Sequence, residues 1–495
     1  MNKISFLLLF SGFCVFAHAQ NTFSKVVGFE NSLDHGTILV NTPKGFLATC
    51  GSVDLSSNIY YLGTIALDKN GKEIRKNRLS FGEHKIVRYG RSLALRNGNV
   101  ADFRTLQQYD TTKKDFTTWV ALIMLNDLGD TLWTRQFLDS SLHVVARTLI
   151  EAPDSGLFLI GDETKSITNH DPLVIRVDKN GNEVSRHSNL TSGITALFSV
   201  VKHPNGKYYG SGYGGSGSYA DAFVTEMDSS MKPVWSRYYT AKVGHAAILT
   251  ILQDGNLVFG TDTLVEEWGS SKLKLMRKQI FKIDTNGLII WRKIHDEIGE
   301  SNYYNKVVER KNNELFVVGR RQPQEGIHHT LTKLTAEGDT IWMHQYAYES
   351  LDDVNYISDM LATEDGGVLM VGDVTPDGGY QDVWLLKVDS NGCVNNDCAK
   401  TLVYGQILST SENASESKIS IYPNPSSNGI LKIRGLSSDL EYEFILSSLD
   451  GKILKIISQF GGQPFLLKNI SSGVYLLIIK LENEIISQQK VVIYE

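Results

Sequence analysis

The chain has 495 residues, 42% of them hydrophobic, and its 55 acidic and 49 basic side chains give a formal net charge of −6. This length allows more than one domain, while a small negative charge without basic runs excludes electrostatic support for a nucleic-acid partner. Glycine is abundant (43) and proline scarce (10), which is typical of a fold with many hairpin turns.

The first 19 residues are predicted to be a signal peptide. Lys3 supplies the positive charge, residues 4–16 form an apolar segment, and Ala-His-Ala predicts cleavage between Ala19 and Gln20. The apolar segment has 13 residues, too few to span a bilayer, and no other segment predicts a transmembrane helix. We therefore expect an exported protein without a transmembrane segment.

A turn-and-strand pattern then returns seven times between residues 36 and 392, at a period of 49 to 58 residues. Each copy has a Gly- or Asn-centred turn before one apolar strand, as at Gly156, and a second strand that runs into an Asp-x-Asn-Gly-like turn, as at Asp178. Several short strands per unit at such a period are typical of propeller blades. The sequence predicts an all-β chain in which residues 20–398 form a seven-bladed β-propeller.

Each copy predicts four antiparallel strands, as between residues 197 and 239 in the fourth copy. In four copies a Trp follows the second turn by four residues, and we expect it to pack into the neighbouring blade. These residues are Trp133, Trp235, Trp291 and Trp342. The seventh copy supplies three strands only, so a strand at 22–28 is expected to complete it and close the ring.

The order of the strands separates two faces of the ring. Tight turns lie on one face, and the connections between second and third strands and between blades lie on the other. Long irregular loops are predicted on that second face at 104–117, 161–170, 212–220 and 261–274. Because binding residues concentrate on loops of a rigid scaffold, we expect a site on the loop face rather than the turn face.

Three cysteines remain after signal cleavage. Cys393 and Cys398 are five residues apart in a chain that carries an export signal, which predicts a disulfide at the end of the repeats. Two thiols do not complete a zinc site. Cys50 lies in a predicted strand and is expected to be a buried apolar residue.

The repeats stop near residue 399. Residues 399–417 are rich in Ser and Glu and predict a linker, and residues 418–495 have short strands and turns that predict a small β-sandwich. Four spaced motifs stand out in this module: Tyr-Pro-Asn-Pro, Asp-Gly-Lys, Gly-Val-Tyr, and a basic residue before the last apolar strand. Their residues are Tyr422, Pro423, Asn424, Pro425, Asp450, Gly451, Lys452, Gly473, Tyr475 and Lys490.

Over its whole length this module resembles the type A C-terminal sorting domain of the type IX secretion system of Bacteroidetes. The resemblance implies an immunoglobulin-like β-sandwich and passage from the periplasm across the outer membrane through the type IX machinery. It also implies removal of the module, with the cargo released or attached at the cell surface. The repeats look like propeller cargo often found beside such domains, and the resemblance assigns no activity to that cargo.

No catalytic or cofactor-binding motif is found in the sequence. A Gly-x-Ser-x-Gly elbow, a His-Glu-x-x-His motif, a Walker loop and an EF-hand loop are all missing. The adjacent pair His328 and His329 would point to opposite faces of a strand. We therefore expect no catalytic residues, no metal and no cofactor.

Two sets of residues are candidates for ligand binding. Asp171, Asp221 and Asp382 open equivalent third strands, where an acidic set suits Ca²⁺ or a glycan hydroxyl, although turn capping is the favoured explanation because only three of seven repeats carry such an Asp. Tyr213, Tyr219 and Trp268 lie in or beside loop-face connections, as do Tyr109 and Tyr380, and their rings suit stacking on sugar or peptide.

The sequence favours a secreted or cell-surface propeller that binds a glycan or a protein without catalysis. The alternative is a secreted hydrolase that acts on polysaccharide with carboxylates in the central pocket, about 5 to 10 Å apart. A purely structural role is a third possibility.

Overall fold

The computed structural model describes residues 21–110, 115–138, 143–166, 169–188, 194–214, 220–243, 248–268, 273–299, 302–310, 312–321, 328–348, 355–376, 379–394, 406–407, 419–424, 426, 429–434, 436–437, 440–448, 452–461, 463–467, 470–481 and 484–493. The chain divides into two compact units, Met1–Ser409 and Thr410–Glu495. All named elements are strands, and in the described part of the chain no helix is long and apolar enough to cross a membrane.

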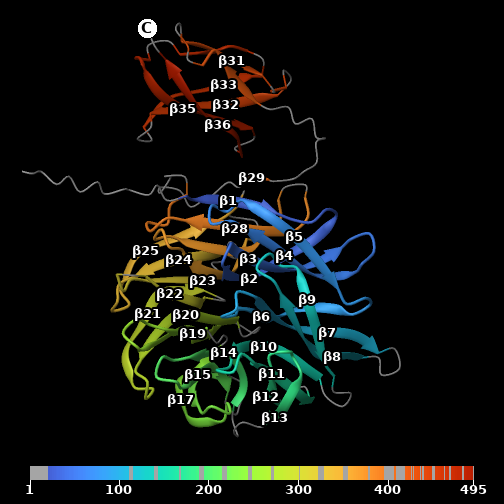
Figure 1. The fold of residues 1–495 in the computed structure, drawn as a ribbon. Helices are drawn as coiled ribbons and strands as arrows, with labels where there is room; N and C mark the ends of the chain where they lie inside the picture. The colour runs from blue at the N-terminus through green and yellow to red at the C-terminus, as the bar shows by residue number, and fades with distance from the viewer. Residues whose placement is uncertain are drawn as a thin grey trace, which may run out of the picture. The chain divides into compact units, whose positions relative to one another are not determined.

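Most of the first unit consists of antiparallel sheets, each made by four consecutive strands (Figure 1). The first three sheets contain β2 (Ser32–Thr42), β3 (Gly45–Asp54), β4 (Tyr60–Leu67) and β5 (Glu73–Ser80); β6 (Lys85–Ala94), β7 (Val100–Asp110), β8 (Asp115–Leu125) and β9 (Thr131–Phe137); and β10 (His143–Glu151), β11 (Leu157–Ser166), β12 (Asn169–Val177) and β13 (Glu183–Ser188). The next three contain β14 (Ile194–Lys202), β15 (Tyr208–Gly214), β16 (Ala220–Met227) and β17 (Pro233–Val243); β18 (Thr250–Ile251), β19 (Leu257–Trp268), β20 (Leu273–Ile283) and β21 (Ile289–Gly299); and β22 (Tyr303–Glu309), β23 (Leu315–Arg321), β24 (His328–Leu334) and β25 (Thr340–Tyr346).

The last sheet of this unit joins the two ends of the repeat region. It holds β26 (Tyr356–Ala362), β27 (Val368–Val374) and β28 (Asp382–Val388), followed by β1 (Phe23–Val27) from the beginning of the chain. β1 pairs antiparallel with β28, and β29 (Gln406–Ile407) adds a parallel strand outside β1. Figure 1 shows blue β1 next to orange β28. The predicted pairing of the N-terminal strand with the last repeat is confirmed.

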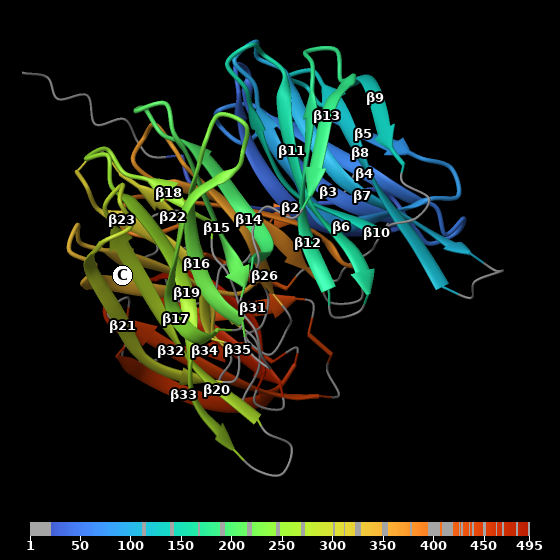
Figure 2. The same ribbon diagram turned by 90° about the horizontal axis from the view of Figure 1, so that it is seen from below.

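Apolar cores lie between neighbouring sheets. One cluster joins Leu122 of the second sheet to Leu159 of the third, and another joins Leu39 of the first sheet to Val371 of the last. β2 lies against both β6 and β26, so the sheets follow one another around a centre (Figure 2). Inner strands are therefore apolar on both faces, and every residue of β27 is buried. This is a propeller-like all-β fold, as the sequence predicts.

The Trp residues of the fourth strands pack into the following sheet, which confirms that prediction. A Cβ atom placed on Gly181 would lie 2.6 Å from the ring of Trp133, and the φ of +80° at Gly181 also favours glycine. The other pairs are Trp235 with Gly287, Trp291 with Gly338, and Trp342 with Gly392. Phe23 of β1 lies in the same way over Gly71 of the first sheet, so the closure repeats this contact.

The predicted long irregular loops are wrong at three of four places. Strand pairing continues through most of 104–117, 161–170 and 261–274, with Asp110 opposite Asp115 and Trp268 opposite Leu273 at the ends of two hairpins. In the remaining segment, 212–220, strand β15 ends at Gly214 and residues 215–219 lie outside the described part. The error arises because polar residues extend these strands where cross-strand hydrogen bonds satisfy the backbone.

The second unit contains two small sheets around one core. One sheet has β30 (Ser420–Tyr422), β31 (Ile430–Arg434) and β34 (Phe465–Leu466), and the other has β33 (Ile453–Phe460), β32 (Glu441–Ser448), β35 (Gly473–Leu481) and β36 (Glu484–Ile493) in that order. Leu431 of the first sheet and Phe444 of the second belong to the same buried cluster.

Several motif residues of the second unit hold its strands together. Asn424 donates its side-chain N–H to the Lys490 carbonyl at 2.7 Å and accepts the Val492 N–H at 2.8 Å, which ties the first motif to β36. The Tyr475 hydroxyl donates to the Ser471 carbonyl at 2.7 Å. Three other motif residues lie outside the described residues: Pro425, Asp450 and Gly451.

Candidate functional site

The acidic candidates lie in three different sheets. Asp171 belongs to β12, Asp221 to β16 and Asp382 to β28. Asp382 is close to Gly28, where an added Cβ would lie 1.9 Å from its carboxylate oxygen. Among the residues that the structure describes, no group of three acidic, His or Cys side chains is placed to hold a metal ion. Binding by these three Asp residues stays a prediction.

The aromatic candidates have separate positions. Tyr213 in β15 packs against Phe198 with ring centroids 4.9 Å apart, whereas Tyr109 and Tyr380 are about half exposed. Trp268 is the last residue of β19. Tyr219 lies outside the described residues, as do Ala19, Gln20 and Cys398.

The structure describes two of the three cysteines of the predicted mature chain. Cys393 is disulfide-bonded, while Cys50 is free and buried. Because Cys398 is not described, its pairing with Cys393 stays a prediction. Burial, together with the nearby Asp34 carboxylate, raises the pKa of the Cys50 thiol well above its usual value.

A cavity of about 490 Å³ lies where the first strands of the sheets converge, and we call it the central chamber. β2, β6, β10, β14, β22 and β26 all contribute lining residues, and β23 and β24 add Arg320 and His329. The contributing ends of β22, β23, β24 and β26 are those at the loop face. The chamber therefore opens into the centre of the first unit from the face that the sequence favours.

β-Bulges place five side chains in the chamber. In each of five first strands, the pairing register with the second strand skips one residue, and that residue lines the chamber. The skipped residues are Thr37, Arg147, Phe198, Asn305 and Ser358. A bulge leaves one residue unpaired and re-aims its side chain. Residues of very different chemistry, one from each of five sheets, therefore line the same cavity.

Arg147 contacts both a buried carboxylate and an aromatic ring. Its guanidinium group forms an ion pair with Asp162, which is fully buried. The same guanidinium lies over the Phe198 ring at 4.7 Å from the centroid. Tyr213 also packs against the Phe198 ring, so a sequence candidate supports the chamber through Phe198.

A second group of charges surrounds Asp359, which is 1% exposed. Its carboxylate binds the Lys306 ammonium at 2.5 Å and accepts the Leu39 backbone N–H at 3.0 Å. Arg91 approaches the same carboxylate only to 4.0 Å. Two cations therefore share one carboxylate at the wall of the chamber.

Phenol and imidazole groups complete the lining. Burial raises the pKa of Tyr303, and its hydrogen bond to Arg320 opposes that shift. The His329 ring packs edge-on against Tyr356, with centroids 5.3 Å apart. Sequence reasoning considered His329 only as half of an adjacent pair, and the fold shows that it lies beside groups from other strands.

The acidic side chains described near the chamber do not line it. None of the described lining residues is Asp or Glu. The nearby acids have partners: Asp162 forms an ion pair with Arg147 and Asp359 with Lys306, and Asp373 is hydrogen-bonded to His35 at 2.7 Å. The described lining thus offers three guanidinium groups and no carboxylate.

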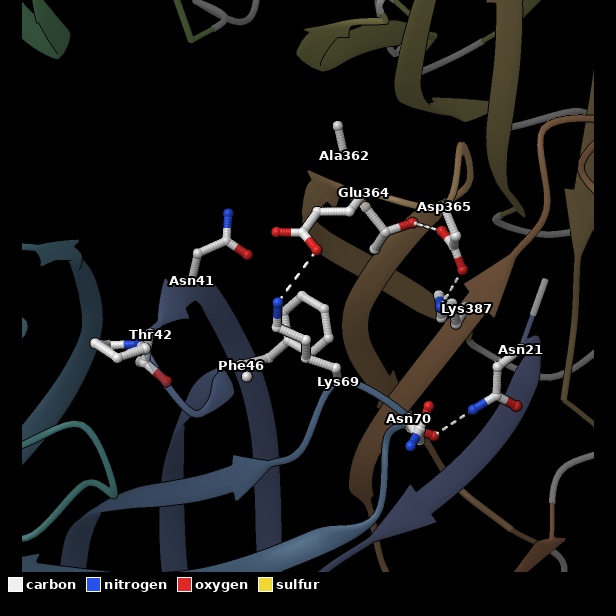
Figure 3. Close-up of a pocket in the computed structure, with 13 residues that line it drawn as sticks. Asn21, Asn41, Thr42, Phe46, Lys69, Asn70, Ala362, Glu364, Asp365 and Lys387 are labelled. Atoms are coloured by element: carbon white, nitrogen blue, oxygen red, sulfur yellow. Dashed lines mark hydrogen bonds and ion pairs between the residues drawn. The ribbon is translucent and has the colours of Figure 1, made fainter. Parts of the chain in front are cut away.

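A larger cavity, of about 980 Å³, lies on the turn face between the first and last sheets, and we call it the turn-face cavity (Figure 3). Lys69 and Glu364 face each other across it at 3.1 Å, and both are well exposed. Lys387 binds Asp365 at 2.5 Å. The sequence favours the loop face for a site, yet charged side chains also converge on the turn face here. Their charges are largely satisfied by one another, which leaves little for a ligand.

No family model and no characterised protein matches this sequence. Solved structures with a similar fold include an ulvan lyase bound to a glucuronic acid–sulfated rhamnose unit, with a TM-score of 0.51 and 8% identity, covering 74% of this chain and 96% of that one. The β-propeller domain of a trilobed protease from Pyrococcus furiosus has a TM-score of 0.41 and 10% identity, covering 74% and 98%. An α-L-arabinofuranosidase from Fusarium graminearum has a TM-score of 0.42 and 11% identity, covering 61% and 93%. At 8% identity the likeness to the ulvan lyase shows a similar fold alone, and no conclusion is drawn from the other two structures.

Proposed function

We propose that this chain is an exported seven-bladed β-propeller with a C-terminal immunoglobulin-like sorting domain, and that its central chamber binds a glycan. Support for seven blades comes from seven repeats and from sheets that pack in succession around a centre. The predicted signal peptide and the spaced motifs of residues 418–495 support export through the type IX machinery to the medium or the cell surface.

The observation that carries glycan binding is the convergence of bulged residues in the chamber. Five sheets each deliver one re-aimed side chain to the same cavity, although a regular strand would have cost less distortion. Aromatic rings, amide groups and guanidinium groups together are the usual lining of a small-ligand pocket. Phe198 and Tyr356 provide flat apolar surfaces for a sugar ring.

Binding is tested with the mature full-length protein on a glycan array, followed by calorimetry of the hits. If Phe198 is an anchor, Phe198→Ala weakens binding by about 1 kcal/mol or more. Tyr380→Ala is the matched control, because Tyr380 is an exposed aromatic residue that does not line the chamber. Equal affinity of both variants and the parent protein would place the ligand elsewhere.

Export is tested by deleting residues 418–495 in the native host or a related one. The truncated protein is expected to accumulate in the periplasm, while the full-length chain reaches the medium or the surface. Secretion of the truncated protein at the parental level would reject the sorting function.

A second candidate function is cleavage of an acidic polysaccharide. It is favoured by Tyr303, His329 and Arg320, which place proton-transfer groups and a cation in one cavity. A similar fold is found in an ulvan lyase. Chain shortening of the bound glycan by the parent protein, lost in Tyr303→Phe, would support this function. Intact glycan after prolonged incubation would leave binding as the function.

A further inference from the structure

We propose that the glycan bound in the chamber is acidic, and that a carboxylate or sulfate group on the sugar binds Arg91. This inference rests on the proposed glycan-binding function and names the class of ligand. Three observations support it. The Arg91 guanidinium has unused hydrogen-bond donors, positive charge exceeds negative charge around it, and aromatic rings lie beside Arg147.

Arg91 has donor capacity to spare. Among the described residues its only polar partner is Asp359, and their closest atoms are 4.0 Å apart, too far for a hydrogen bond. A guanidinium group has five N–H donors in a planar fork that matches an oxyanion. The Arg91 side chain is 23% exposed and lines the chamber, so these donors are accessible to a ligand there.

The charge balance around Arg91 is positive. Asp359 is the nearest carboxylate, and it already holds the Lys306 ammonium at 2.5 Å and a backbone N–H at 3.0 Å. One negative charge therefore faces two cations. An anionic group in the chamber would neutralise the excess through charge-assisted hydrogen bonds to the guanidinium group.

The rings favour a sugar as the carrier of this anionic group. The Arg147 guanidinium lies over the Phe198 ring at 4.7 Å from its centroid, and Tyr213 packs against the same ring. Phe198 lines the chamber and offers an apolar surface to a pyranose, whose charged substituent binds Arg91. The volume of about 490 Å³ suits a few sugar residues. An acidic peptide is the competing ligand and forms one arm of the test.

The experiment measures binding to the mature full-length protein by calorimetry. The probes are trigalacturonate, its carboxyl-reduced neutral counterpart, a sulfated carrageenan oligosaccharide and hexaglutamate. At least one acidic sugar is expected to bind roughly tenfold or more tightly than the neutral counterpart, the effect of one hydrogen bond to a charged group. The two acidic sugars separate carboxylate from sulfate recognition.

Arg91→Gln is expected to weaken binding of the acidic sugar roughly tenfold and to leave binding of the neutral sugar unchanged. Arg75→Gln is the matched control, because it removes the same charge from an exposed outer strand. Ser358→Asp and Ser358→Asn form a second pair of nearly equal size at a bulge in the chamber. The Asp variant alone is expected to lose the acidic sugar.

The outcomes separate the two proposals. Equal binding of acidic and neutral sugars, unaffected by Arg91→Gln, overturns the acidic-glycan inference and leaves the glycan-binding function in place. Binding of hexaglutamate alone, or of none of the four probes, overturns both.

Discussion

The turn end of the sheets and the central chamber are built in opposite ways. At the turn end the same contact recurs at five junctions between sheets, with an aromatic ring of one sheet over the turn glycine of the next. In the chamber five sheets each contribute a different residue at a bulge in the first strand, among them Arg147, Phe198 and Asn305. Recurrence marks positions that hold the architecture, and variation at an equivalent position marks the side of the molecule that is available for a ligand.

The carboxylates show the same contrast. At the turn end, hydrogen bonds from Asn182 hold the pKa of Asp178 below its usual value. The folded state therefore favours the ionised carboxylate. At the loop-face end of β28, burial and the neighbouring Asp34 raise the pKa of Asp382 to about 6. Ionisation of Asp178 therefore stabilises the folded state, whereas ionisation of Asp382 destabilises it.

The largest effect is expected from breaking an ion pair behind the chamber. Arg147→Met leaves the fully buried Asp162 without its cation, and removal of one partner of a buried pair costs about 3–5 kcal/mol. Denaturant unfolding followed by fluorescence measures the loss. The double variant Arg147→Met/Asp162→Leu should recover part of it, since no charge is then stranded. A double variant as unstable as the single one would contradict the assignment of the cost to an unpaired carboxylate.

A slightly smaller effect is expected at the turn end. Trp235→Ala removes the ring that covers Gly287 of the next sheet, and loss of a large packed ring costs about 3 kcal/mol. Val234→Ala is the control on the same strand, because Val234 is 60% exposed and its loss should cost less than about 0.5 kcal/mol. Similar unfolding midpoints for both variants would show that the ring does not join the sheets.

The smallest effect concerns Asp382 and depends on pH. Because its pKa is higher in the folded state, at about 6, than the ordinary value of 3.8, the folded state binds the proton more tightly. Its contribution to stability is therefore present below pH 4 and lost as the pH rises to 6. Asp382→Asn should raise Tm above pH 6, by roughly 2–4 °C for an effect on the order of 1 kcal/mol after allowance for partial exposure.

Thermal unfolding of parent and variant at several pH values between 4 and 7 measures this difference. The variant should gain on the parent as the pH rises through that interval. A constant difference in Tm across the range would mean that Asp382 does not titrate there. Asp178→Asn is a useful companion, since its lowered pKa predicts a loss of stability at neutral pH instead of a gain.

Most of the sheet architecture was accessible from the sequence because it depends on local and recurring signals. The strands of the fourth repeat, predicted between residues 197 and 239, are observed as β14 to β17. The incomplete last repeat pointed to its missing strand, and β1 takes that place. The loop prediction failed because polar composition was taken as a sign of irregular structure, while the hairpin pairing of β7 with β8 and of β19 with β20 continues through those residues.

The chamber was not accessible in the same way. Arg91 and Arg147 lie in unremarkable strand segments, and no spacing rule brings them together. A usable signal existed at Arg147, Phe198 and Asn305, which occupy comparable places in first strands but differ in chemistry. The register shifts that expose them depend on pairing with the second strand, and are visible only once both strands are placed.

The sequence by itself determined the repeat, the hairpins within each copy and the turn residues, because these follow from short-range backbone preferences and from apolar periodicity. It also determined which residues recur, and hence the ring-over-glycine contacts between sheets. Only the tertiary structure decided which side chains meet in the centre. Groups as far apart in the chain as Arg91 and Asp359 are brought together by the succession of sheets, and the bulges then turn single residues into the space between them.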